Sequence, residues 1–109
     1  MVGAAILVVT QMPDRASALT LARSLVESRL AACVSVGAPV ESLYHWRGKI
    51  ETALEIPVVV KTRAERYADV EALIRAHHPY ELPEIIAVPI SHGLPAYLEW
   101  IAAETVAAG

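Results

Sequence analysis

The spacing of apolar positions changes several times along the chain, and each change marks a predicted element. Residues Ala4 to Gln11 contain the run AILVV, whose β-branched side chains and short length indicate a buried strand. Asp14 follows a proline as a typical N-cap, and from there to Leu30 the apolar residues recur with helical spacing. One face of this predicted helix carries Ala18, Leu21, Ala22, Leu25 and Val26.

Residues 33–46 change to a period of two, which predicts a strand with one apolar face, and the same alternation continues after the turn 47–49. A three-residue turn would set Trp46 opposite Ile50 and merge the two apolar rows. A two-residue turn would set Trp46 opposite Lys49 and split them, unless a bulge restored the register. We therefore expect a long hairpin with a three-residue or bulged turn.

Glycine and proline predict where the chain bends and where elements end. Gly37 and Pro39 indicate a bend in the first arm of the hairpin, and Pro57 requires an edge or a bulge because it has no N–H for the ladder. A second helix is predicted from Ala64 to His77, with Pro79 ending it.

A strand from Glu84 to Ile90 and a last helix opening at Pro95 complete the chain. The order predicts an α+β fold, a ferredoxin-like βαββαβ sandwich with a long β-hairpin and an added C-terminal helix, in one domain over residues 1–109. The segments ILVV and IIAV are apolar on both faces, yet three helices in so small a chain would cover mostly one side of the sheet. We expect further copies of the chain to cover the other side.

Composition excludes several classes of function. Hydrophobic residues make up 55% of the chain, which excludes disorder. The net charge is −3 and no basic run occurs, so nucleic-acid binding is not expected. No apolar segment approaches the roughly 20 residues that span a bilayer, so no membrane partner is expected. The single cysteine fits a reducing compartment, and we expect a cytoplasmic protein.

The stretch HHPYELPE, residues 77–84, concentrates the candidate chemistry. Imidazole is a ligand for copper, zinc and nickel, and a helix that frays before Pro79 would let His77 and His78 face one ion. Alternatively, His77 completes the apolar stripe of the helix and His78 caps its last carbonyls. Both interpretations remain open.

Other side chains offer weaker chemistry. Glu81 and Glu84 are candidate ligands or an acid–base pair, or else solvated loop carboxylates. Lys61 either extends out of the sheet into water or, in an oligomer, binds an anion in an inter-subunit groove beside Tyr80. Cys33 fits a buried space-filling role.

The aromatic residues Tyr44, Trp46 and Trp100 fit an interface between copies of the chain or the core better than a cofactor site. No nucleophile motif, phosphate loop or CxxC is present, so we expect no enzyme.

Five motifs in order, AACVSV, SLYHWRGKIE, VVVKT, HHPYELPEIIAVPI and YLEWI, resemble the CutA divalent-cation tolerance family. The resemblance covers the chain from Ala4 to about Val106. It implies a ferredoxin-like fold assembled as a tight homotrimer, similar in build to the PII signalling proteins. It also implies tolerance of, or response to, divalent metals such as copper, with no established catalytic activity and no required cofactor.

The resemblance also implies a metal site. Copper-binding members use a thiol at the end of the first strand together with paired histidines. The histidines match His77 and His78, but the thiol position is Thr10 here, and Cys33 matches a different motif. We therefore expect weak binding of copper or zinc.

One alternative that the PII-like build implies is a signalling module that binds a small anionic ligand in inter-subunit clefts, lined by Lys61, Tyr80, Glu81 and Glu84. A trimeric scaffold for a protein partner is a further alternative.

Overall fold

The computed structural model describes residues 4–106. Its elements are β1 (Ala5–Met12), α1 (Arg15–Glu27), β2 (Cys33–Val36), β3 (Val40–Trp46), β4 (Lys49–Arg63), a 3₁₀ turn (Ala64–Arg66), α2 (Tyr67–His77), β5 (Ile85–Pro89) and α3 (Pro95–Glu104). The order of strands and helices matches the prediction, with the second strand divided into β2 and β3. Asp14 caps α1 as predicted, its side chain accepting a hydrogen bond from Ser17 N at 2.8 Å.

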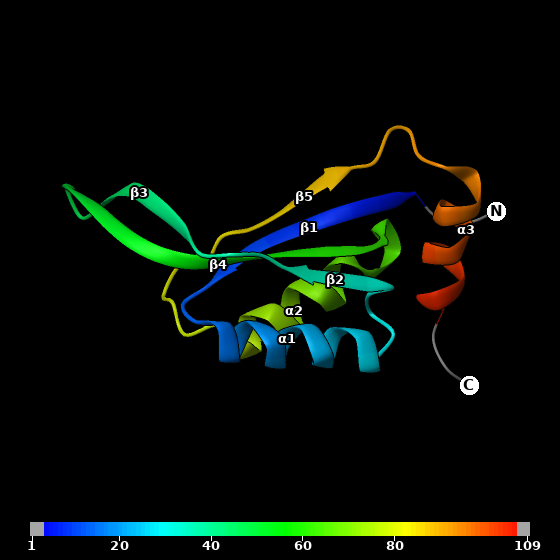
Figure 1. The fold of residues 1–109 in the computed structure, drawn as a ribbon, viewed down its shortest axis with the longest axis horizontal. Coiled ribbons are helices and arrows are strands. Elements are labelled where there is room, and N and C mark those ends of the chain that lie inside the picture. Colours follow the sequence, from blue (N-terminus) through cyan, green and yellow to red (C-terminus); the bar gives the residue numbers. More distant parts are fainter. Residues whose placement is uncertain (1–3, 107–109) are drawn as a thin grey trace.

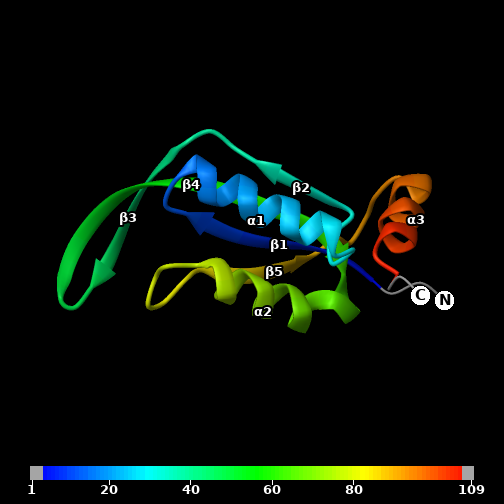
Figure 2. The ribbon, with the colours of Figure 1, turned by 90° about the horizontal axis from the view of Figure 1, so that it is seen from below.

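The strands form one antiparallel five-stranded sheet in the order β2-β4-β1-β5, and β3 pairs with the outer half of β4 (Figure 1). Helices α1 and α2 lie side by side on one face of this sheet (Figure 2). Helix α3 lies at the end of the sheet remote from the β3–β4 hairpin, which projects beyond the body of the protein. The protein is therefore an α+β fold with three helices.

The core lies between the sheet and the helix pair α1–α2. Alternate residues of β1 are buried, and Val8 and Met12 are fully enclosed with Leu25 of α1 and Ile74 of α2. The predicted apolar face of α1 is confirmed for Ala18, Leu21 and Leu25. It is wrong for Val26, which is 44% exposed. At about 100° per residue, Val26 lies some 80° around the helix from Ala18 and so falls at the edge of the stripe.

The opposite face of the sheet is uncovered in the protomer. In the central strand, Val9 lies opposite Val59 on one side and Ile86 on the other. Val88 lies opposite Leu7 in the same way. Ile86 is 52% exposed and Val88 is 44% exposed. An apolar face without helices, as the sequence predicts, is therefore present.

The predicted three-residue turn of the hairpin is wrong. Trp46 pairs with Lys49, so only Arg47 and Gly48 form the turn. Their φ angles are 50° and 78°, and two positive φ angles are what the tight type I′ hairpin turn requires. Pairing in this register puts the even-numbered apolar residues of β3 and those of β4 on opposite faces of the hairpin. Leu43, Ile50 and Leu54 are consequently 66%, 70% and 69% exposed.

The break in pairing predicted at Pro57 is present as a bulge at the base of the hairpin. Val36 pairs with Val58 and Val40 with Glu55, so three residues of one strand face two of the other. Gly37 N donates to the Pro57 carbonyl at 2.9 Å. Because the N–H and C=O of a strand residue point to the same side, the N–H that Pro57 lacks would also point toward this break in pairing. A Cβ on Gly37 would lie 2.8 Å from Pro57 Cγ, so the close approach requires glycine.

Candidate functional site

The segment that follows α2 turns away from the helix axis at His78. This residue is extended, with φ −88° and ψ 128°, because the proline after it disfavours the helical conformation. The two histidine side chains therefore leave the chain from different backbone conformations and must be considered separately.

His77 is anchored to its own helix. Its Nδ1 lies 3.1 Å from the carbonyl oxygen of Leu73 in the last turn of α2. A carbonyl oxygen only accepts, so Nδ1 carries the proton and donates. The lone pair of Nε2 is then directed away from this contact. His77 thus makes the bond to a terminal helix carbonyl that the sequence analysis assigned to His78.

His78 connects the segment to the sheet. Its Nε2 lies 2.6 Å from the carbonyl oxygen of Gln11, near the end of β1, and by the same reasoning donates to it. Its Nδ1 accepts a longer hydrogen bond, 3.3 Å, from Tyr80 N. The imidazole also packs against the Tyr80 ring, with 4.5 Å between centroids. The predicted role of His78 as a cap on α2 is therefore wrong, because its ring bonds to β1.

The position expected to hold a thiol is enclosed in the core. Thr10 is fully buried, and its hydroxyl oxygen has no hydrogen-bond partner among the described residues. Within residues 4–106, no group of three or more His, Cys, Asp and Glu side chains is placed to hold a metal ion. Thr10 therefore adds no thiol to the two imidazoles of His77 and His78.

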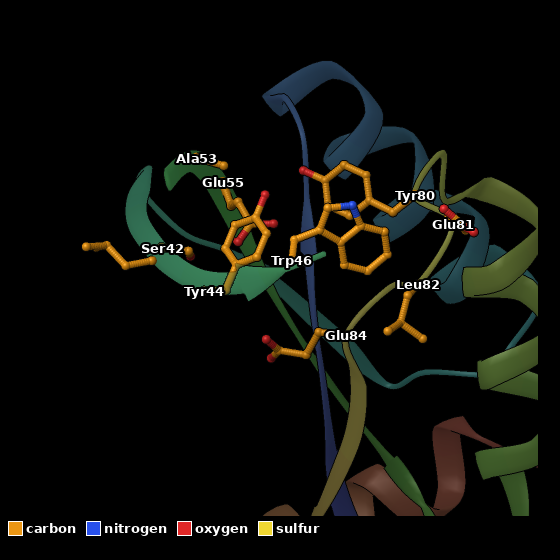
Figure 3. Close-up of a pocket in the computed structure, with 10 residues that line it drawn as sticks. Ser42, Tyr44, Trp46, Ala53, Glu55, Tyr80, Glu81, Leu82 and Glu84 are labelled. Carbon is orange, nitrogen blue, oxygen red and sulfur yellow. The ribbon is translucent and has the colours of Figure 1, made fainter. Parts of the chain in front are cut away.

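A groove of about 780 Å³ lies between the hairpin and the loop that follows α2 (Figure 3). Its aromatic lining consists of Tyr44 and Trp46 from β3 and Tyr80 from the loop. Leu82 adds apolar surface from the loop side. We call this space the hairpin groove.

Three carboxylates also line the hairpin groove. Two, Glu81 and Glu84, were predicted for a ligand cleft, and the third is Glu55 of β4. Glu55 is only 9% exposed. Burial raises the pKa of the Tyr80 hydroxyl above its usual value, and the negative charge of Glu55 and a hydrogen bond to it raise the pKa further. The groove is therefore acidic as well as aromatic.

Lys61 lies outside the hairpin groove. Its ammonium group is 3.3 Å from Ser35 Oγ and 3.8 Å from Cys33 Sγ, on the sheet face that the helices leave uncovered. A single chain therefore does not bring Lys61 together with Tyr80. Cys33 is half-buried beside this lysine in the single chain, so its role as a buried space-filler stays a prediction.

The three aromatic residues predicted for an interface do not form one cluster. Tyr44 and Trp46 lie on the hairpin, whereas Trp100 lies on α3, at the other end of the sheet (Figure 1). Trp100 is 41% exposed and packs against Tyr97, with 5.4 Å between ring centroids. Their part in an interface stays a prediction.

Glu55 was missed by the sequence analysis because of the turn. A three-residue turn pairs even positions of the two arms and puts Glu55 on the face opposite Tyr44 and Trp46. The observed two-residue turn pairs even positions of β3 with odd positions of β4, so Glu55 shares a face with both aromatic residues. The signal that identifies Glu55 is the glycine at the second turn position, which favours the shorter turn.

The fold and the groove define a class: α+β proteins with an antiparallel sheet, helices packed on one face and a projecting hairpin. The CutA1 divalent ion tolerance protein family matches residues 6–104, and the chain belongs to this family. It is 42% identical to the Xenopus laevis CutA homolog over 89 residues, which is 82% of this chain and 59% of that relative.

Solved structures agree with this assignment. The CutA crystal structure from Xylella fastidiosa has a TM-score of 0.92 and 44% identity, covering 95% of this chain and 100% of that one. The CutA structure from Archaeoglobus fulgidus, described as a periplasmic divalent cation tolerance protein, has a TM-score of 0.90 and 38% identity, covering 94% and 99%. Each likeness covers nearly all of this chain.

No helix of residues 4–106 is long and apolar enough to cross a membrane. Relatives are assigned to more than one compartment, since the protein from Arabidopsis thaliana, 38% identical over 96 residues, is named as chloroplastic.

Proposed function

We propose that this protein is a copper-type divalent-cation tolerance or response protein that works as a homotrimer, binds its metal weakly and catalyses no reaction. Membership of the CutA1 family supports the link to divalent cations. The uncovered sheet face around Val9 and Ile86 supports an assembly, because contiguous apolar surface of this kind is buried in most stable proteins. The strand order β2-β4-β1-β5 supports the ferredoxin-like assignment.

The observation that carries the metal proposal is the anchoring of both imidazoles. His77 and His78 each donate one ring N–H to a backbone carbonyl. Metal-ligating histidines almost always donate their second ring nitrogen in this way, which fixes the ring and leaves the other nitrogen for the metal. Nε2 of His77 and Nδ1 of His78 are the nitrogens left to bind. The latter would have to give up its long bond to Tyr80 N, which favours weak binding.

Titration calorimetry with copper and with zinc tests this proposal. We expect a saturable heat for the wild-type protein that is lost when His77→Ala and His78→Ala are combined. His92→Ala is the matched control, because His92 is exposed in the loop before α3, where its ring bonds to the neighbouring Ser91. Absence of a saturable heat, or a heat that the double variant retains, would exclude a metal site at this histidine pair.

The alternative of a PII-like module for a small anionic ligand has less support. In one chain the hairpin groove offers three carboxylates and no lysine. An anion site would require Lys61 to reach the groove from a neighbouring copy. A cytoplasmic location, as expected from the sequence, would suit either function.

A further inference from the structure

The hairpin groove contains a largely buried carboxylate, Glu55, that forms no ion pair among the described residues. Glu55 is 9% exposed, and none of the ion pairs among residues 4–106 includes it. The Tyr80 hydroxyl interacts with Glu55 but supplies no positive charge. A carboxylate held in a largely enclosed groove without a cation attracts a positive group of a ligand.

We propose that the hairpin groove binds a small organic cation that carries an alkylammonium or guanidinium group, with Glu55 as its buried counter-charge. This site uses neither histidine as a ligand, although His78 packs against Tyr80 of the groove, and it goes beyond the proposed response to divalent metals. Glu84, which also lines the groove, supplies a second carboxylate for a ligand with two cationic ends.

Aromatic side chains make the groove selective for an organic cation. Tyr44, Trp46 and Tyr80 line it together with Glu55, and Figure 3 shows Tyr44 and Glu55 projecting from the hairpin while Tyr80 and Glu84 come from the loop. A cation placed over an aromatic face is attracted by the ring electrons, and the effect grows when water is excluded. An alkyl chain between two cationic groups would also contact Leu82.

At the rim of the groove, a cationic side chain of the protein already contacts both an aromatic ring and a carboxylate. The guanidinium of Arg47 lies 5.4 Å from the centre of the Trp46 ring, and it pairs with Glu81 at 3.0 Å. Both partners of that ion pair are more than 70% exposed. The same combination of ring and carboxylate is repeated inside the groove, where Glu55 has no arginine. The volume of about 780 Å³ lies in the range of small-ligand sites, which favours a small molecule as the occupant.

Tryptophan fluorescence offers a direct test. The chain has two tryptophans, so the variant Trp100→Phe leaves Trp46 of the groove as the sole reporter. Agmatine and spermidine, titrated into this protein in its assembled state, are expected to give a saturable change in emission. In a Glu55→Gln background the dissociation constant should rise by at least about tenfold, because a charge-assisted contact is lost while the side-chain shape is kept.

Three controls make the result specific. Glu41→Gln removes an exposed carboxylate that does not line the groove, and it should leave the dissociation constant unchanged. Citrate, an anion, should give no saturable change. The variant His77→Ala should still bind agmatine, and Glu55→Gln should still bind copper or zinc, so failure of one site is distinguishable from failure of the other. No saturable response to either amine, or equal binding by Glu55→Gln, would overturn the proposal.

Discussion

Replacing Ile86 with glutamate is expected to abolish assembly while leaving the protomer folded. Ile86 lies opposite Val9 on the uncovered sheet face and is 52% exposed in the single chain, so a lone protomer tolerates a carboxylate there. Burying that carboxylate between copies of the chain would cost several kcal/mol per protomer, because the residue opposite it, Val9, is apolar and offers no charge or hydrogen-bond partner. Light scattering after size exclusion should therefore show a mass near 11.7 kDa for the variant, with far-UV circular dichroism like that of the wild type.

The matched control for this prediction is Leu19→Glu. Leu19 lies on α1, on the helical side of the sheet, and its exposure of 47% is close to that of Ile86. This variant should assemble like the wild type. If Ile86→Glu assembles equally well, the uncovered face is not the interface.

Replacing Arg63 with alanine is expected to lower the free energy of unfolding by about 2–3 kcal/mol. The side chain of Arg63, only 15% exposed, donates from Nε to Thr105 Oγ1 and from Nη2 to Thr105 O, both at 2.9 Å. Thr105 is fully buried at the end of α3, so these bonds fasten that helix to the end of β4. Urea denaturation of the assembled protein at fixed concentration measures the change.

Two variants distinguish the effect of the paired hydrogen bonds of Arg63 from the effect of its positive charge. Arg63→Lys keeps the charge but cannot make two parallel bonds, so it should recover less than half of the lost stability. Arg23→Ala removes an arginine that is 80% exposed and pairs with Glu27 at 3.8 Å, and it should change stability by less than about 0.5 kcal/mol. A loss at Arg63 no larger than that at Arg23 would contradict the role assigned to Arg63.

Elements with a single strong period were predicted well from the sequence. The buried strand at β1, the cap at Asp14 and the helical face through Leu21 and Leu25 were predicted because another arrangement would expose apolar side chains or leave the helix start uncapped. The termination of α2 at Pro79 follows from sterics alone.

The hairpin was predicted less well because two physical effects compete there. Merging the apolar rows favours a longer turn, whereas the preference of Gly48 for positive φ favours a two-residue turn. The turn prevails, and Leu43, Ile50 and Leu54 stay exposed as a result. The candidate cleft was recovered only in part for the same reason. Tyr80 and Glu84 were predicted, while Glu55 depended on the register.

The predicted pair of histidines illustrates a different limit. Adjacent positions in a sequence do not show which carbonyl each ring reaches. His77 bonds within its helix and His78 reaches Gln11, 67 positions earlier in the chain, a contact that only the tertiary fold creates.

The central claim is that three copies of this chain together cover the uncovered sheet face. Sedimentation equilibrium of the wild-type protein at micromolar concentration tests it. The account predicts one species with three times the 11.7 kDa mass of the chain. A well-folded particle of 11.7 kDa at that dilution would contradict it.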